Sequence, residues 1–190
     1  MATPVYLVSN VHRSGSSMTM RCLKEGGLNV IYDGDSNEMN QTSSFDYVPN
    51  PNGFYQFNNQ IDSNFYEQYK GSAIKCPIRE LLNLPKGYYK LLFLKRNPKE
   101  IRMSMAKWTP YQSWGADEGL TYLYDPYISL LLEELTKRGD FEITIMEYAK
   151  IVKSPLTEFK KLKNAGWPID PKKCASMVDP ELHRFKIENK

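Results

Sequence analysis

Basic and hydroxyl side chains gather in one short stretch near the start of the chain, Arg13-Ser14-Gly15-Ser16-Ser17. A glycine among serines lets the backbone come close to a ligand, and the hydroxyls add hydrogen-bond donors. Arg13 adds a planar guanidinium that can bind two oxygens at once. These residue types suit an anion such as a phosphate or a sulfate. The spacing fits neither G-x-x-x-x-G-K-[ST] nor G-x-G-x-x-G, so the stretch is not a standard nucleotide loop. An ordinary surface turn is the alternative interpretation.

The elements on either side of this stretch favour anion binding. Residues 4–8, PVYLV, are apolar and predict a buried strand, and a helix is expected from Ser16 to the Gly26-Gly27 pair. A strand that turns directly into a helix leaves the first helical N–H groups pointing at the turn, where they and the helix dipole attract negative charge. We therefore expect the anion to be bound by six consecutive residues, namely Arg13, Ser14, Gly15, Ser16, Ser17 and Met18.

A second group of residues with the right chemistry follows another strand. Residues 88–94, YYKLLFL, predict a core strand, and Arg96 comes directly after it. Asn97 suits the cap of a helix whose first residue is Pro98, and Ser104 lies on that helix, eight residues after Arg96. An arginine at the strand end and a hydroxyl on the helix can hold one phosphate from two sides. The alternatives are a surface ion pair for Arg96 and a backbone-bonded serine for Ser104.

The remaining pattern alternates strands with helices. Further strands are predicted at 28–32, 72–76 and 141–145, and further helices at 78–84, 117–138 and 154–165, with a short helix and an extended end in the tail. Pro126 predicts a kink or a break in the helix 117–138. The expected apolar stripe of that helix comprises Leu120, Leu123, Tyr124, Tyr127, Leu130, Leu131 and Leu135.

This alternation predicts a three-layer α/β/α fold with a mainly parallel central sheet. In such sheets the ligand lies at the carboxyl ends of the strands. The Arg13 stretch and the Arg96 turn both follow strands, so we expect both to open on one crevice.

Length, charge and cysteine content limit the possible functions. The chain has 190 residues and a net charge of +3, which predicts a single domain without a broad nucleic-acid-binding face. Three widely spaced cysteines and two histidines argue against a disulfide framework or a metal centre. No signal peptide or apolar run of membrane-spanning length is visible, so we expect a cytoplasmic protein that does not bind membranes. The oligomeric state stays open.

One segment, at about 36–69, differs from the rest of the predicted domain. It is rich in Asn, Ser, Asp and aromatic residues and is too long for a simple connection in a compact domain. We expect a lid or an acceptor-binding insertion with short helical pieces, because so many aromatic side chains favour burial. A partly disordered insertion is the alternative.

On these residues the chain resembles the sulfotransferases that use 3′-phosphoadenosine 5′-phosphosulfate (PAPS). Arg13-Ser14-Gly15-Ser16-Ser17 is similar to the family's 5′-phosphosulfate loop, and Arg96 with Ser104 matches the arginine and serine of its 3′-phosphate motif. Near the C-terminus, the stretch MEYAKIVKSPLTEFKKLKNAGWPID resembles a strand and helix of the family. The resemblance implies a P-loop NTPase-like sulfotransferase fold, PAPS as co-substrate and no metal.

The chain departs from the family pattern at the catalytic base. Cytosolic members carry a histidine after a Lys-Thr pair, whereas this chain has Lys75-Cys76-Pro77, which retains the lysine alone. Other branches use an acid downstream of the first loop. The resemblance therefore suggests Lys75 near the transferred sulfate, and a base ranked in the order Glu38, Asp35, Asp33 and His12.

The resemblance implies transfer of a sulfuryl group to a hydroxyl or amine of a small-molecule or glycan acceptor. Arg13 and the loop N–H groups would stabilise the leaving-group charge. Two alternatives remain, a catalytically inactive module that binds adenosine 3′,5′-bisphosphate and a nucleotide or small-molecule kinase with an atypical phosphate loop. The absent Walker-type Lys-Ser/Thr pair counts against the kinase.

Overall fold

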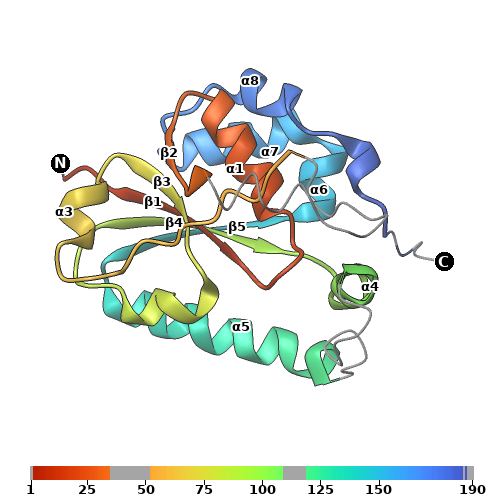
Figure 1. The fold of residues 1–190 in the computed structure, drawn as a ribbon, viewed down its shortest axis with the longest axis horizontal. Helices are drawn as coiled ribbons and strands as arrows, with labels where there is room; N and C mark the ends of the chain where they lie inside the picture. The colour runs from red at the N-terminus through yellow and green to blue at the C-terminus, as the bar shows by residue number, and fades with distance from the viewer. Residues whose placement is uncertain (1, 35–51, 109–118, 186, 188–190) are drawn as a thin grey trace.

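A computed structural model describes residues 2–34, 52–108, 119–185 and 187, and within them the chain forms three layers around a parallel sheet (Figure 1). The strands are β1 (Val5–Asn10), β2 (Asn29–Ile31), β3 (Ser72–Lys75), β4 (Tyr89–Lys95) and β5 (Phe141–Glu147). Their order is β2-β3-β1-β4-β5, and every neighbouring pair is parallel. The predicted three-layer α/β fold is therefore confirmed.

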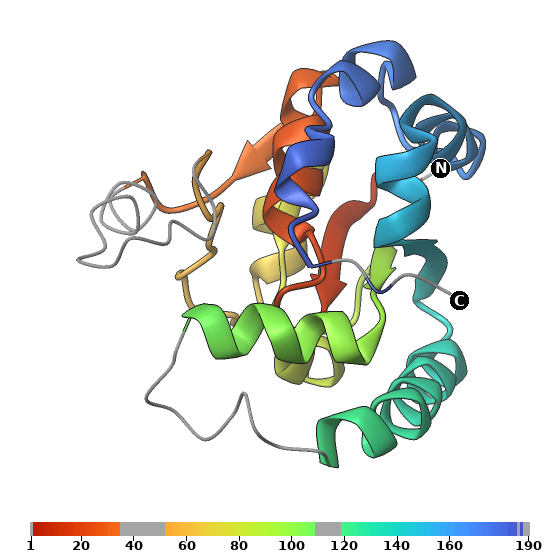
Figure 2. The same cartoon turned by 90° about the vertical axis from the view of Figure 1, so that its right-hand side faces the viewer.

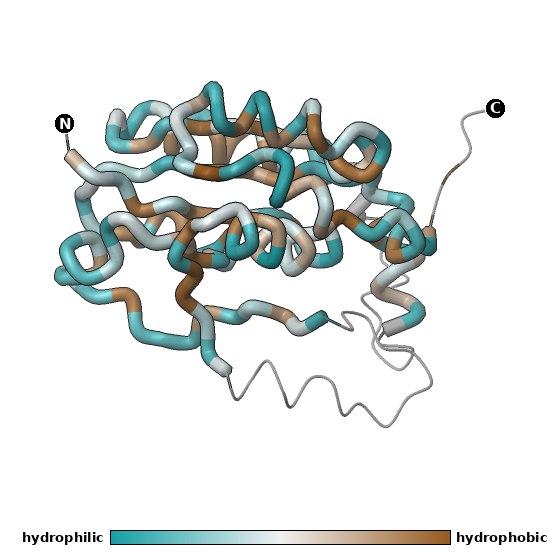
Figure 3. Tube along the Cα trace, turned by 90° about the horizontal axis from the view of Figure 1, so that it is seen from above, coloured by the Kyte–Doolittle hydropathy of each residue, from teal (hydrophilic) through white to brown (hydrophobic). Residues whose placement is uncertain are grey.

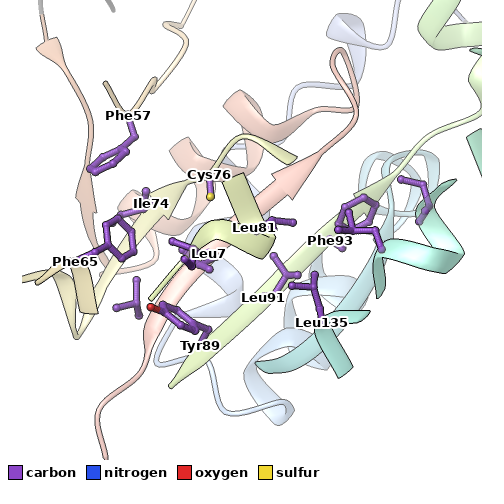
Figure 4. Close-up of a cluster of buried hydrophobic side chains, with 14 of the residues drawn as sticks. Leu7, Phe57, Phe65, Ile74, Cys76, Leu81, Tyr89, Leu91, Phe93 and Leu135 are labelled. Atoms are coloured by element: carbon purple, nitrogen blue, oxygen red, sulfur yellow. The ribbon is translucent and has the colours of Figure 1, made fainter. Parts of the chain in front are cut away.

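Each central strand is buried on both faces because helices cover both sides of the sheet. Val5 and Leu7 of β1 pack in one core, whereas Tyr6 and Val8 pack in the other. Leu91 and Phe93 of β4 join the first core, as Figure 4 shows with Leu7, Ile74 and Leu135. Because successive side chains of a strand enter opposite cores, both strands are continuous apolar runs in the sequence.

Helices divide between these two faces. The helices α3 (Phe65–Tyr69), η1 (Ile78–Asn83), α4 (Pro98–Trp108) and α5 (Gly119–Arg138) contribute to the first core. The helices α1 (Ser16–Glu25), α6 (Tyr148–Lys153), α7 (Pro155–Asn164) and α8 (Pro171–Ser176) lie on the opposite face, and η3 (Pro180–Leu182) follows them. Figure 2 shows the layers from the side, and Figure 3 shows hydrophobic and hydrophilic residues alternating along the covering helices.

The helix α5 corrects two predictions. It runs unbroken through Pro126, so a break into two helices is wrong; packing against the sheet outweighs the lost backbone bond. The predicted apolar stripe is also partly wrong. In α5 the buried residues are Tyr124, Ile128, Leu131 and Leu135, whereas Leu123, Tyr127 and Leu130 are exposed. The side chain of Leu120 lies outside the described residues. The buried set follows the 3.6-residue period of a single face, and the predicted set mixed two neighbouring faces.

Two short helices add detail to the predicted pattern. The helix predicted at 78–84 is a 3₁₀-helix over residues 78–83, and the short helix α6 between β5 and α7 was not predicted. In the segment 52–69 the aromatic residues Phe54, Tyr55, Phe57, Phe65 and Tyr69 are buried, as expected from its aromatic content, whereas the part of the predicted insertion at 36–51 lies outside the described residues. Within the described ranges, no helix is long and apolar enough to cross a membrane.

Candidate functional site

A cavity of about 380 Å³ lies at the carboxyl ends of β1, β3 and β4. Its walls come from the loop after β1, from residues 52–58, from residues 75–79, and from Arg96 and Ser104. Tyr148 and the C-terminal residues Met177, Leu182 and Phe185 complete it. The size is within the range of small-molecule sites. Arg13 and Arg96 both line this cavity, as expected of a shared crevice at the strand ends.

The loop between β1 and α1 has a backbone that only certain residues tolerate. Arg13 has a φ of 66° and Gly15 a φ of 88°, both in the left-handed region. A Cβ at Gly15 would also lie 2.4 Å from Cδ2 of Tyr148. Glycine is thus required by the turn and by the close approach of the Tyr148 ring.

The predicted loop residues differ in their access to the cavity. Arg13, Gly15, Ser16, Ser17 and Met18 line it. Ser14 is fully buried and does not line the cavity.

The two predicted motifs meet in space. Arg13 Nε donates a hydrogen bond of 3.0 Å to Ser104 Oγ, and Arg96 Nη1 donates one of 2.9 Å to the Arg13 carbonyl. These partners are 91 and 83 residues apart in the chain. Arg13, Arg96 and Ser104 therefore form one basic cluster, called the arginine site below.

Arg96 is held by charge and by an aromatic ring. Its Nε lies 2.9 Å from Glu100 Oε2, and the two side chains are only 7% and 8% exposed. Its guanidinium lies 4.6 Å from the centre of the Tyr148 ring, within the range of a cation–π contact. Burial raises the pKa of Glu100, but the hydrogen bonds from His183 and Arg96 outweigh burial and lower it overall. Glu100 therefore stays ionised beside Arg96.

The C-terminal segment is tied to the arginine site. His183 Nε2 lies 3.0 Å from Glu100 Oε2, and Ile187 N donates to Glu100 Oε1 over 3.3 Å. Arg96 Nη2 donates to the Phe185 carbonyl over 3.2 Å. The sequence showed Glu100 only as a helix-start residue and gave no sign of His183, because their partners are distant in the chain.

On the other side of the cavity, Lys75 and Ser17 form a second donor cluster, called the loop site below. Lys75 Nζ lies 2.7 Å from the Phe54 carbonyl oxygen and 3.2 Å from Ser17 Oγ. Ser17 Oγ donates to the same Phe54 oxygen over 3.0 Å. Burial and, to a lesser degree, the charge of Arg13 lower the pKa of Lys75 to about 8. The loop site is thus cationic near neutral pH but easily deprotonated.

The candidate bases differ in position. Asp33 accepts a hydrogen bond of 2.8 Å from Asn58 Nδ2 and does not line the cavity. Asp35 and Glu38 lie outside the described residues. His12 lines the cavity, and loss of hydration followed by the charges of Lys75, Arg79 and Arg13 lowers its pKa. His12 is therefore neutral near pH 7 and able to accept a proton.

The described cavity wall is strongly basic. It includes Arg13, Arg21, Lys75, Arg79 and Arg96, and none of the described lining residues is Asp or Glu. Within the same described ranges, no group of three His, Cys, Asp or Glu residues is placed to hold a metal ion. Such a wall suits a ligand with several negative charges.

The likeness of this chain to known proteins is structural and distant. No family model matches the sequence, and no curated protein matches it. Among solved structures, the chain is similar to retinol dehydratase in complex with androsterone and the inactive cofactor PAP, with 13% identity and a TM-score of 0.45. The match covers 92% of this chain and 63% of that one, so the present chain spans less than two thirds of its length.

Proposed function

We propose that the protein is a sulfotransferase that moves a sulfuryl group from PAPS to a hydroxyl or amine of a small-molecule or glycan acceptor. The observation that supports this most strongly is the arginine site, where Arg13 contacts Ser104 and Arg96 contacts the Arg13 backbone. PAPS carries a phosphate at the 3′ position of its ribose and a phosphosulfate at the 5′ position, so it needs two anion sites in one cavity. The loop site and the arginine site supply them.

The proposed roles follow the positions of the side chains. Arg96 and Ser104 bind the 3′-phosphate, and the loop N–H groups bind the 5′-phosphosulfate together with Arg13, which contacts Ser104 but whose charge also acts on Lys75 of the loop site. Ser14, which is buried, takes part through its backbone alone. Lys75 and Ser17, whose polar atoms are 3.2 Å apart, hold the oxygens of the sulfuryl group.

In the proposed reaction the acceptor oxygen or nitrogen attacks sulfur, and the bond from sulfur to the bridging oxygen of the 5′-phosphate breaks. Arg13 and Lys75 stabilise the charge that builds on that oxygen, which leaves with adenosine 3′,5′-bisphosphate. The acceptor proton goes to a base. Among the described residues, His12 is the base on the cavity wall, while Glu38 and Asp35 stay predictions from the sequence.

Direct binding tests the proposal. Calorimetry with adenosine 3′,5′-bisphosphate should give binding to the wild-type protein and a loss of about tenfold or more for Arg13→Ala and for Arg96→Ala, because each removes a charge-assisted contact. Arg102→Ala is the matched control, since Arg102 lies on α4 with Ser104 but does not line the cavity. Unchanged affinity in both test variants would overturn the site assignment.

An inactive binding module is the second candidate. The absence of a histidine after Lys75, where Cys76-Pro77 stands, favours it. Turnover separates the two functions: an enzyme consumes PAPS with at least one acceptor from a panel of phenols, amines and sugars, whereas a binding module consumes none. Thermal stabilisation by ATP but not by PAPS would instead indicate the kinase.

A further inference from the structure

The oxygen of one backbone carbonyl lies at the centre of the loop site. The Phe54 carbonyl accepts hydrogen bonds from both Lys75 Nζ, at 2.7 Å, and Ser17 Oγ, at 3.0 Å. Gly53 and Phe54 themselves line the cavity and are buried. The chain therefore fills, with its own oxygen, the place where two donors of the loop site meet.

These two donors are well suited to an anionic oxygen. An ammonium and a hydroxyl at hydrogen-bond distance from one point bind a charged oxygen more strongly than a neutral carbonyl. The helix N-terminus at Ser16 adds positive potential on the same side. A sulfonate oxygen can take the same place, with the same two bonds.

The segment 53–57, called the strap below, is held there by contacts outside the donor cluster. Asp33 N donates to the Gln56 carbonyl over 2.8 Å. The Tyr55 ring lies 5.0 Å from the Tyr32 ring. Tyr55 has a φ of 54°, which is unfavourable for a residue with a side chain. Phe57 anchors the other end of the strap in the core, where its ring lies 5.8 Å from that of Phe65 and 5.3 Å from that of Tyr69. The strained residue Tyr55 lies between this anchor and the Phe54 carbonyl, so a local change around Tyr55 can withdraw that carbonyl while Phe57 stays packed.

We propose that the strap is autoinhibitory: the Phe54 carbonyl occupies the position of a sulfuryl oxygen, and PAPS must displace it to bind productively. The inference rests on the proposed function and deepens it. PAPS, whose sulfuryl group reaches Lys75 and Ser17, opens the strap. Adenosine 3′,5′-bisphosphate, which lacks that group, leaves the strap closed. Because only the open form accepts PAPS fully, its apparent affinity is reduced by the open fraction.

A variant that weakens the strap without touching the cavity tests this. Tyr32 does not line the cavity, and Tyr32→Ala removes its ring contact with Tyr55. We expect PAPS to bind about two- to tenfold more tightly, and adenosine 3′,5′-bisphosphate to bind as before, from the usual strength of an aromatic pair. Tyr66→Ala is the matched control, because it removes a ring contact with Tyr89 away from the cavity; its affinities should equal those of the wild type.

Hydrogen exchange of the wild-type protein gives a second measurement that needs no variant. PAPS should speed exchange of the Asp33 amide, which the strap protects, and adenosine 3′,5′-bisphosphate should not. If both ligands bind but the Asp33 amide stays protected and Tyr32→Ala leaves PAPS affinity unchanged, the strap inference is overturned while the proposed function stands. If neither ligand binds, both are overturned.

Discussion

The arginine site and the loop site lie in the same cavity but differ in what faces their cations. Arg96 is paired with Glu100, a buried carboxylate that His183 also contacts. Lys75 lies at hydrogen-bond distance from two neutral oxygens, of which the Phe54 carbonyl is the nearer. An ionic partner fixes a charged side chain in place, whereas a neutral carbonyl yields to a charged ligand. The side chains of the arginine site are therefore held in place as a rigid frame. In the loop site, by contrast, a ligand oxygen can replace the Phe54 carbonyl oxygen.

The largest effect on stability is expected when the pair between Arg96 and Glu100 is broken. Glu100→Ala leaves the buried Arg96 without its ionic partner, and we expect a loss of about 3–5 kcal/mol in the free energy of unfolding. Urea denaturation measures it. Glu133→Ala, which removes an exposed pair with Lys137, is the control and should cost far less, because water screens that pair. Equal losses in the two variants would contradict the idea of a rigid frame.

The second prediction concerns the turn that joins the two sites. Gly15→Ala places a Cβ against the Tyr148 ring and forces a residue with a side chain to a φ of 88°. We expect a loss of about 1–3 kcal/mol in stability from strain alone, together with weaker binding of adenosine 3′,5′-bisphosphate. Gly27→Ala separates the two causes, because its φ is also positive but nothing lies near its Cβ. If both variants bind equally well, the contact with Tyr148 is unimportant.

The difference between the sites also predicts a pH profile for turnover. Lys75, whose pKa is lowered to about 8, loses its proton as the pH rises through that value, so kcat/KM should fall there. At low pH His12 takes up a proton and ceases to act as base, so kcat/KM should fall below a pKa lower than 6.5. His12→Gln should remove most of the activity, a loss of about 10²–10⁴-fold. An acid limb near the pKa of a carboxylate, with His12→Gln active, would indicate Glu38 or Asp35.

The smallest effect is expected at the outer anchor of the strap. Asp33 lies beside Asn58 and does not line the cavity, so Asp33→Ala should change kcat by no more than about twofold, in contrast to the much larger contribution of a general base. A steady-state assay at saturating PAPS measures this. A drop of about 100-fold would restore Asp33 as a candidate base and contradict the distinction between strap and catalytic groups.

Much of the framework could be predicted from local sequence. Apolar runs predicted the central strands, and Gly26 and the Asn97-Pro98 pair predicted helix boundaries. At the second boundary Asn97 Oδ1 accepts a hydrogen bond of 2.9 Å from Lys99 N, as expected of a helix cap. The exposed face of α5 was harder, because Leu123 and Leu131 differ in burial but not in residue type. Which of two neighbouring stripes faces the sheet depends on how the helix is rotated.

The amino-acid sequence alone specifies the residue types of the site and their order: a small polar loop with Arg13 after one strand, and Arg96 with Ser104 after another. These follow from short-range patterns, since strands, turns and helix starts are encoded by nearby residues. The folded chain is needed to see that Arg13 contacts Ser104 and that Glu100, which His183 also contacts, pairs with Arg96. It is also needed to see that the Phe54 carbonyl accepts from Lys75 and Ser17 in the loop site. Most of those contacts join residues far apart in the chain, and no local periodicity records them.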